Sequence, residues 1–242
     1  MDVTWFSILG ERCSGTNFLR KLIYDNFNLL LMGLPDYDIT GWKHFFGSPK
    51  NVEAIRKSSE WCLVYTIVRD PIDYLVSFYL NYHHQAPDRY TDFETFLTSE
   101  FYSVDKKCEI MADRNQKTNE RYKDIFEMRA AKLKFLYSIV PLLTSTSVFM
   151  RYEDLKANPI LFLERWTKDF NLPRLAEEWI IETRRIRPQS TTWFRFEFSD
   201  KPLNDNYKIE DPKIKEIIRN RLDFDTESLV GYHKEDILKR LE

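Results

Sequence analysis

The stretch VTWFSILGERCSGTN, residues 3–17, decides the fold of this 242-residue chain. Residues 3–9 form a β-rich apolar run that stops at Gly10. Residues 17–27 repeat their apolar side chains at helical spacing, which predicts an amphipathic helix. A strand, a glycine-containing loop and a helix in this order are typical of the start of a parallel α/β fold.

The rest of the chain continues this pattern. The clearest buried strand is 62–68 (CLVYTIV). These seven residues include no charge, as is expected of a strand that is covered on both faces. Asp70 can cap the helix that follows, with Pro71 in its first turn and its end near residue 82. Further strands are expected at 38–42 and 147–152. Further helices are expected at 51–59, 93–101, 116–143, 159–170, 177–185, 211–222 and 234–241, with loops at 83–92 and 187–206. Since no repeat or linker interrupts the pattern, we expect one domain, residues 1–242, with a central parallel sheet flanked by helices.

The composition argues against several classes of protein. A net charge of only -2 disfavours nonspecific binding of nucleic acid through a global positive field. The three cysteines, Cys13, Cys62 and Cys108, are widely spaced, so we expect reduced thiols rather than a thiolate metal site. No apolar run approaches the roughly 18 residues of a membrane span, and no signal peptide is visible. We therefore expect a cytoplasmic protein.

Residues 10–17 (GERCSGTN), here called the glycine loop, are the first candidate site. Gly10 and Gly15 are separated by four residues and lie between the predicted strand and helix, where backbone N–H groups can point at an anion. The spacing matches a phosphate-binding loop, but Thr16 replaces the usual lysine and Asn17 the hydroxyl residue that holds magnesium. This disfavours a magnesium-nucleotide enzyme and favours a phosphate-like ligand bound without a metal. The alternative is a tight strand-to-helix turn with no ligand.

The residues that follow the buried strand include an arginine and a serine whose chemistry suits a phosphate. Residues 68–79 (VRDPIDYLVSFY) place Arg69 at the strand end and Ser77 two helical turns later. A guanidinium group suits a phosphate, and the serine can donate from the same helix face. The alternatives are a surface ion pair of Arg69 with Asp70 or Asp73, and a serine that only packs the helix.

These segments resemble the PAPS-dependent sulfotransferase family, which transfers a sulfuryl group from 3′-phosphoadenosine 5′-phosphosulfate (PAPS). Arg69 and Ser77 match the family's grip on the 3′-phosphate, and the glycine loop is similar to its 5′-phosphosulfate loop in the R-x-S-G-T form. Residues 148–159 (VFMRYEDLKANP) look like the family segment whose tyrosine lies near the adenine, and residues 227–232 (ESLVGY) look like its C-terminal helix motif. The resemblance implies a fold like that of P-loop nucleoside triphosphate hydrolases. It also implies a nucleotide site formed by Arg12, Cys13, Ser14, Gly15, Thr16, Asn17, Arg69, Ser77 and Tyr152.

The resemblance also suggests catalytic residues. His44, in GWKHFFG (41–47), is similarly placed to the family's base, and imidazole suits proton transfer near neutral pH. Lys43 could assist the transferred group, and Arg12 could neutralise the 5′-phosphate and the developing charge. The alternatives are that His44 is structural, and that His83 and His84 face the acceptor.

The sequence thus predicts a metal-free transfer of sulfate from PAPS to an acceptor hydroxyl by in-line displacement. The loop form is similar to that of glycan-modifying relatives, which suggests a carbohydrate acceptor. The family's late arginine-lysine-glycine triplet is missing, and its role could pass to Arg184, Arg185 and Arg187, or to Arg195 and Lys201. The aromatic segment with Trp193, Phe194, Phe196 and Phe198 could line the acceptor pocket, cap the nucleotide or pack in the core. The rival functions are a degenerate P-loop kinase and a noncatalytic nucleotide-binding module; the oligomeric state is open.

Overall fold

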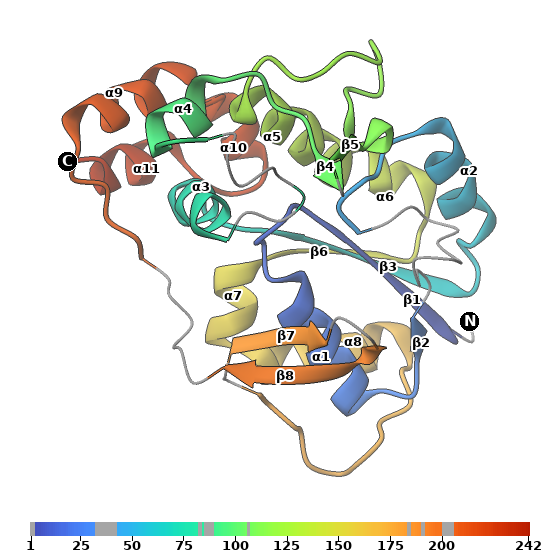
Figure 1. The fold of residues 1–242 in the computed structure, drawn as a ribbon. Coiled ribbons are helices and arrows are strands. Elements are labelled where there is room, and N and C mark those ends of the chain that lie inside the picture. Colours follow the sequence, from blue (N-terminus) through green and yellow to red (C-terminus); the bar gives the residue numbers. More distant parts are fainter. Residues whose placement is uncertain are drawn as a thin grey trace.

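A central sheet of four parallel strands organises the molecule (Figure 1). The computed structural model describes residues 3–31, 43–81, 84, 90–105, 107–182, 185–189, 192–199 and 206–242, with the backbone alone for 185–189 and 192–199. In spatial order the strands are β2 (Leu30–Leu31), β1 (Trp5–Gly10), β3 (Cys62–Val68) and β6 (Ser147–Arg151). All three pairings are parallel, with Trp5 opposite Cys62 and Val68 opposite Arg151. The predicted central parallel sheet is therefore confirmed.

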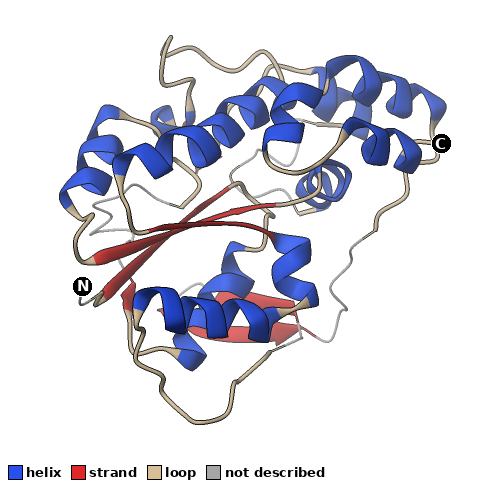
Figure 2. Ribbon diagram, turned by 180° about the vertical axis from the view of Figure 1, so that it is seen from behind, coloured by secondary structure: helices blue, strands red, loops and turns tan. Residues whose placement is uncertain are grey.

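Helices cover both faces of the sheet, because the strands alternate their apolar side chains between two cores (Figure 2). On β3, Leu63, Tyr65 and Ile67 belong to one core, while Val64 and Val68 belong to the other. The first face carries α1 (Thr16–Asn26), α7 (Tyr152–Ala157) and α8 (Pro159–Phe170). The second face carries α2 (Pro49–Lys57), α3 (Pro71–Leu80), α4 (Phe93–Thr98), α5 (Ile125–Lys134), α6 (Val140–Leu143), α9 (Pro212–Arg221), α10 (Phe224–Leu229) and α11 (Lys234–Arg240).

The strongest sequence signals agree with the structure. The strand at 62–68 and the helix at 159–170 have the predicted bounds, and Asp70 caps α3 by accepting hydrogen bonds from two backbone N–H groups. Leu30–Leu31, for which no strand was predicted, forms the edge strand β2. The strand expected at 38–42 falls outside the described residues. A short hairpin of β4 (Val104–Asp105) and β5 (Cys108–Glu109) precedes a 3₁₀ turn at Met111–Asp113.

The long helix predicted at 116–143 is shorter in the structure. It begins at Ile125, because Asp124 caps it and the backbone of Tyr122 pairs with that of Phe101. It passes through a π-helical turn at Phe135–Ile139 and continues as α6. Pro141 lies just after this turn and has no N–H to donate, which accounts for the break in the regular α-helical ladder.

The predictions are wrong at residues 177–182, 185–189 and 192–199, which are the described residues between 177 and 199. Instead of a helix at 177–185, residues 177–182 run without regular structure. The Asn26 side chain donates from Nδ2 to the carbonyl oxygen of Ile180 and accepts at Oδ1 from the backbone N–H of Ile180. Instead of a loop, β7 (Arg185–Gln189) and β8 (Thr192–Ser199) form an antiparallel hairpin whose strand β7 lies against α1 (Figure 1). From Phe194 to Ser199 the sequence FRFEFS alternates aromatic with polar residues, and this period of two is typical of a strand.

Candidate anion site at the carboxyl ends of the strands

The glycine loop and Arg69 lie at neighbouring strand ends. After β1 the chain moves to β2 on one side and then crosses to β3 on the other, so the strand order reverses at β1. Gly10 at the end of β1 pairs with Ile67 of β3, two residues before Arg69. Ligands of open parallel sheets bind at such a reversal, beyond the carboxyl ends of the strands.

Gly15 has the conformation and the contacts that only glycine tolerates. Its φ angle is 92°, in the left-handed region that a side chain disfavours. A Cβ atom at this position would lie 2.3 Å from Cδ2 of Tyr152. Tyr152 is buried and its ring also packs edge-to-face against that of Phe18, so it has little room to move. The ring of Tyr152 therefore packs directly against Gly15 of the glycine loop.

The glycine loop is closed by its own hydrogen bonds. The Ser14 Oγ donates to the carbonyl oxygen of Glu11 at 2.7 Å, and Ser14 N approaches the same oxygen at 3.3 Å. Helix α1 then begins at Thr16, with no side-chain cap at Gly15 and no acidic residue in its first turn. The positive end of the helix dipole is thus not neutralised from within its first turn, which favours an anion there.

The structure brings Arg69 and Ser77 to the glycine loop. Nη1 of Arg69 donates to the carbonyl oxygen of Cys13 at 2.9 Å, and its guanidinium carbon lies 5.2 Å from the centre of the Tyr152 ring. The Cys13 Sγ lies 3.7 Å from the carbonyl oxygen of Ser77 on α3. Cys13, Gly15, Arg69, Ser77 and Tyr152 therefore form one cluster. The carboxylates of Asp70 and Asp73, the alternative partners for Arg69, both contact Arg240.

Lys43 places a titratable cation at the start of α1. Its Nζ donates to Oδ1 of Asn17 at 2.7 Å, and its carbonyl oxygen accepts from Gly10 N at 2.9 Å. Burial, followed by repulsion from Arg20, lowers the pKa of Lys43 to about 7. The side chain can therefore gain or lose its charge near neutral pH, beside the first turn of the helix.

His44 is anchored to the glycine loop. Its Nδ1 lies 2.8 Å from the carbonyl oxygen of Gly10, and the residue is only 4% exposed. Because a carbonyl oxygen can only accept, Nδ1 carries the proton in the neutral ring and Nε2 carries the lone pair. The ring is thus both structural and in the tautomer that a base at Nε2 requires.

Arg12 contacts a buried carboxylate instead of facing the helix end. Its Nη2 donates to Oδ2 of Asp113 at 2.7 Å and to the Ser103 Oγ at 2.6 Å. The guanidinium group also lies against the rings of Phe45 and Phe78. Its charge is balanced within the protein, so its role in neutralising a bound phosphate stays a prediction.

Two buried cations of α5, Arg129 and Lys132, were not among the residues predicted from the sequence. Arg129 donates to Glu11 Oε2 at 2.7 Å, to both carboxylate oxygens of Glu227, and to the carbonyl oxygen of Arg69 at 2.8 Å. Lys132 binds Asp113 and the carbonyl oxygen of His44. The available signal was that both cations adjoin the apolar face of the predicted helix, where a charge needs a buried partner.

Burial of this network shifts its proton equilibria. Desolvation raises the pKa of Glu11 to about 7, although the charge of Arg129 opposes the shift. The pKa of Glu227 is raised for the same reason. Glu11 belongs to the glycine loop, so the charge of the loop changes with pH near neutrality.

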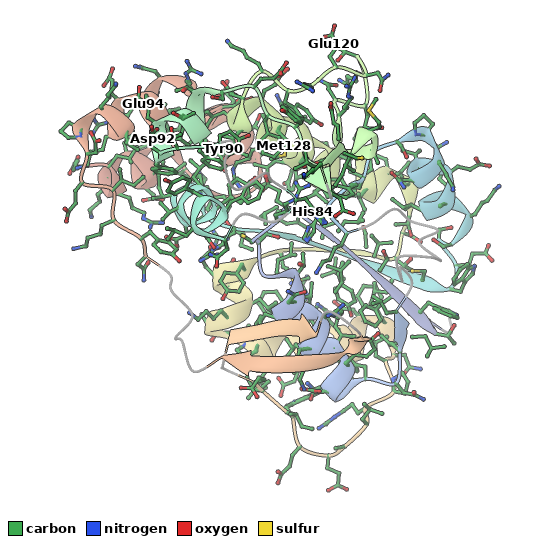
Figure 3. All side chains as sticks on the ribbon, in the orientation of Figure 1. His84, Tyr90, Asp92, Glu94, Glu120 and Met128 are labelled. Carbon is green, nitrogen blue, oxygen red and sulfur yellow. The ribbon has the colours of Figure 1, made fainter. Side chains whose placement is uncertain are left out.

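The remaining candidates are only partly described. His84 lies on the α5 side of the sheet, 5.4 Å from the Phe45 ring, and burial lowers its pKa to about 4 (Figure 3). His83, Arg184 and Lys201 fall outside the described residues. The side chains of Arg185, Arg187, Arg195 and the aromatic segment do so as well.

Two further features are absent from the described residues. No group of three or more His, Cys, Asp or Glu side chains is placed to hold a metal ion. No helix is both long and apolar enough to cross a membrane. The sequence matches no protein-family model and no curated protein.

Proposed function

We propose that the chain is a PAPS-dependent sulfotransferase, built on a sheet arranged like that of the P-loop nucleoside triphosphate hydrolases. The observation that carries this proposal is the hydrogen bond from Arg69 to the carbonyl oxygen of Cys13. It joins two anion grips, the glycine loop and the Arg69–Ser77 pair, at the point where the strand order reverses. A nucleotide with phosphate-like groups at both its 5′ and 3′ positions fits two neighbouring grips.

The 5′-phosphosulfate would lie on the first turn of α1, beside Lys43 and Asn17. The 3′-phosphate would lie on Arg69 and on the hydroxyl of Ser77, which makes no hydrogen bond to any described residue. Thr16 and Asn17 supply neither the lysine nor the magnesium-binding hydroxyl of a triphosphate site. This chemistry favours PAPS over a magnesium-bound triphosphate.

The reaction would be an in-line displacement at sulfur. The acceptor oxygen forms a bond to sulfur while the bond between sulfur and the 5′-phosphate oxygen breaks, and the electron pair stays on adenosine 3′,5′-bisphosphate. Nε2 of His44 takes the proton of the acceptor hydroxyl, and protonated Lys43 stabilises the charge on the leaving oxygen. The proposed acceptor is a carbohydrate hydroxyl.

A noncatalytic nucleotide-binding module is the second candidate. It is favoured by the contacts of Arg12 with Asp113 and of His44 with Gly10, which give both residues structural roles. The two candidates share the nucleotide site and differ only in turnover.

Binding is tested first, by calorimetry and thermal shift with adenosine 3′,5′-bisphosphate, AMP and magnesium-ATP. We expect the bisphosphate to bind most tightly, and Ser77→Ala and Arg69→Ala to weaken it. Ser77→Ala removes only a hydroxyl, so it separates the loss of ligand from any loss of fold. Arg165→Ala, at an exposed arginine of α8, is the matched control for Arg69→Ala. A wild-type protein that prefers magnesium-ATP, or a bisphosphate affinity unchanged in both variants, would refute the proposed ligand.

Turnover is tested with PAPS carrying labelled sulfate and a panel of carbohydrate and phenolic acceptors. We expect transfer to a carbohydrate, and loss of transfer in His44→Gln with bisphosphate binding retained. Transfer to no acceptor, together with tight bisphosphate binding, would support the noncatalytic module. Undiminished transfer by His44→Gln would remove His44 from the mechanism.

A further inference from the structure

Residues 227–232, the C-terminal motif, have no part in the proposed chemistry, yet they contact the residues that surround Arg69. We infer that Glu227 and Tyr232 of this motif are positioning residues that hold Arg69 in place for the 3′-phosphate. The inference rests on the proposed function for the identity of the ligand, and on the contacts below for the positioning.

The first connection runs through Arg129. The carboxylate of Glu227 accepts from Nε and Nη2 of Arg129, at 2.5 and 2.8 Å. The same Nη2 donates to the carbonyl oxygen of Arg69 at 2.8 Å, while Nη1 donates to Glu11 of the glycine loop. One planar guanidinium group therefore fixes both the peptide that carries Arg69 and the start of the glycine loop. The guanidinium group of Arg129 is rigid, and Glu227 holds it in position. The distance between the two grips therefore depends on Glu227.

The second connection runs through Glu153. The hydroxyl of Tyr232 donates to Oε2 of Glu153 at 2.7 Å, and Oε1 of Glu153 accepts from the backbone N–H of Asp70 at 2.9 Å. Asp70 directly follows Arg69, so this chain of hydrogen bonds fixes the peptide on the other side of the arginine. The carbonyl oxygen of Gly231 also accepts from Arg151, at the end of the neighbouring strand β6.

Together the two connections anchor the backbone on both sides of Arg69 from one short segment. Glu227 is 2% exposed and Tyr232 is 7% exposed, so water competes little for these hydrogen bonds. The guanidinium group of Arg69 reaches the glycine loop from a backbone that is thus held at its carbonyl and at the next N–H. Loosening the Tyr232–Glu153–Asp70 connection, whose hydrogen bonds do not involve the glycine loop, should move the second grip while leaving the first turn of α1 in place.

The test compares two ligands in the intact protein. AMP lacks the 3′-phosphate and reports on the glycine loop, whereas adenosine 3′,5′-bisphosphate reports on both grips. In Tyr232→Phe, which keeps the ring and removes one hydroxyl, we expect the bisphosphate affinity to fall about 3- to 10-fold, the range for one lost hydrogen bond. The AMP affinity should stay unchanged. Glu227→Gln should shift the ratio of the two affinities in the same direction.

The controls are Tyr137→Phe, at an exposed tyrosine of the π-helical turn, and Glu235→Gln, at an exposed residue of α11. Neither should change the ratio. A purely structural role of Tyr232 would weaken both ligands equally or lower only the melting temperature, and either result overturns the inference. An unchanged ratio in both Tyr232→Phe and Glu227→Gln overturns it as well.

A ligand-free measurement separates this inference from the proposed function. The amide hydrogen of Asp70, followed by NMR exchange, should exchange faster in Tyr232→Phe than in wild type, because its acceptor Glu153 is released. If the wild-type protein shows no preference for the bisphosphate over AMP, the proposed function fails. The exchange rate of the Asp70 amide then still tests whether Tyr232 holds the backbone beside Arg69. Unchanged exchange at Asp70 would overturn the positioning regardless of the ligand.

Discussion

Replacement of Gly15 by alanine tests the glycine loop directly. The φ angle of 92° costs an L-residue about 1–2 kcal/mol. In addition, the new Cβ would lie 2.3 Å from Cδ2 and 2.8 Å from Cε2 of Tyr152, whose ring is enclosed by Phe18 and Arg69. Forcing a methyl group into such packing costs about 1–3 kcal/mol. We therefore expect Gly15→Ala to lower the free energy of unfolding by about 2–5 kcal/mol.

Gly47 provides the matched control. Its φ angle of 100° is equally unfavourable for alanine, but the nearest atom to a new Cβ, Cδ2 of Phe135, is 3.5 Å away. Gly47→Ala should therefore cost only the backbone strain of about 1–2 kcal/mol. The difference between the two variants isolates the contact with Tyr152, since the change in unfolded-chain entropy is the same in both.

The assay is urea denaturation of wild type, Gly15→Ala, Gly47→Ala, Tyr152→Ala and the double variant Gly15→Ala/Tyr152→Ala. In the Tyr152→Ala background the cost of Gly15→Ala should fall to that of Gly47→Ala, because the ring is gone. The reasoning is refuted if Gly15→Ala costs no more than Gly47→Ala in the wild-type background. It is also refuted if the cost in the Tyr152→Ala background is undiminished.

Three further predictions concern the buried charges. The pKa of Glu11 in the folded protein, about 7, lies above its ordinary 4.5, so the folded state binds this proton more tightly. The free energy of unfolding should therefore fall by about 3 kcal/mol as the pH rises from 4.5 to about 7. Urea denaturation of Glu11→Gln should not show this decrease with pH. The same decrease in wild type and Glu11→Gln would contradict the prediction. Arg129→Met leaves two carboxylates without their buried cation and should cost about 3–5 kcal/mol. By contrast, Arg165→Met breaks an exposed pair and should cost about 0–1 kcal/mol, and similar costs by denaturation would count against the buried network. Lys43, with a pKa of about 7, is charged below that pH and neutral above it, so bisphosphate affinity should weaken more steeply with rising pH in wild type than in Lys43→Gln. Calorimetry on both proteins cancels the titration of the ligand's own phosphates, and parallel pH profiles would exclude Lys43 from the site.

Local signals in the sequence predicted most of the sheet and the flanking helices. The uncharged run of β3 and the Asp70–Pro71 start of α3 are visible locally because they follow from burial on both faces and from helix capping. The sequence-based prediction is wrong at residues 187–189 and 192–199, where the structure has the hairpin of β7 and β8 in place of a loop. It also overextended the α5 helix, because the pairing of Tyr122 with Phe101 depends on residues distant in sequence.

The candidate site divides in the same way. The spacing of the glycine loop predicts Gly15, and the resemblance of residues 68–79 to a sulfotransferase segment predicts Arg69 and Ser77; both are short-range patterns. The roles of Arg12 and Arg129 cannot be predicted from short-range patterns, because each role depends on which carboxylate the fold places beside the arginine. Arg12 contacts Asp113, which is 101 residues away, and Arg129 contacts Glu11 and Glu227, which are 118 and 98 residues away.

Short stretches of sequence are enough to predict the first strand, the glycine loop and the helix after it, and the arginine that directly follows the next buried strand. These features depend on backbone conformation and on the alternation of buried side chains, which neighbouring residues set. The tertiary structure alone shows which charges are neutralised inside the protein. The reason is that a buried charge must be paired, and the sheet and its helical layers select the partner from anywhere in the chain.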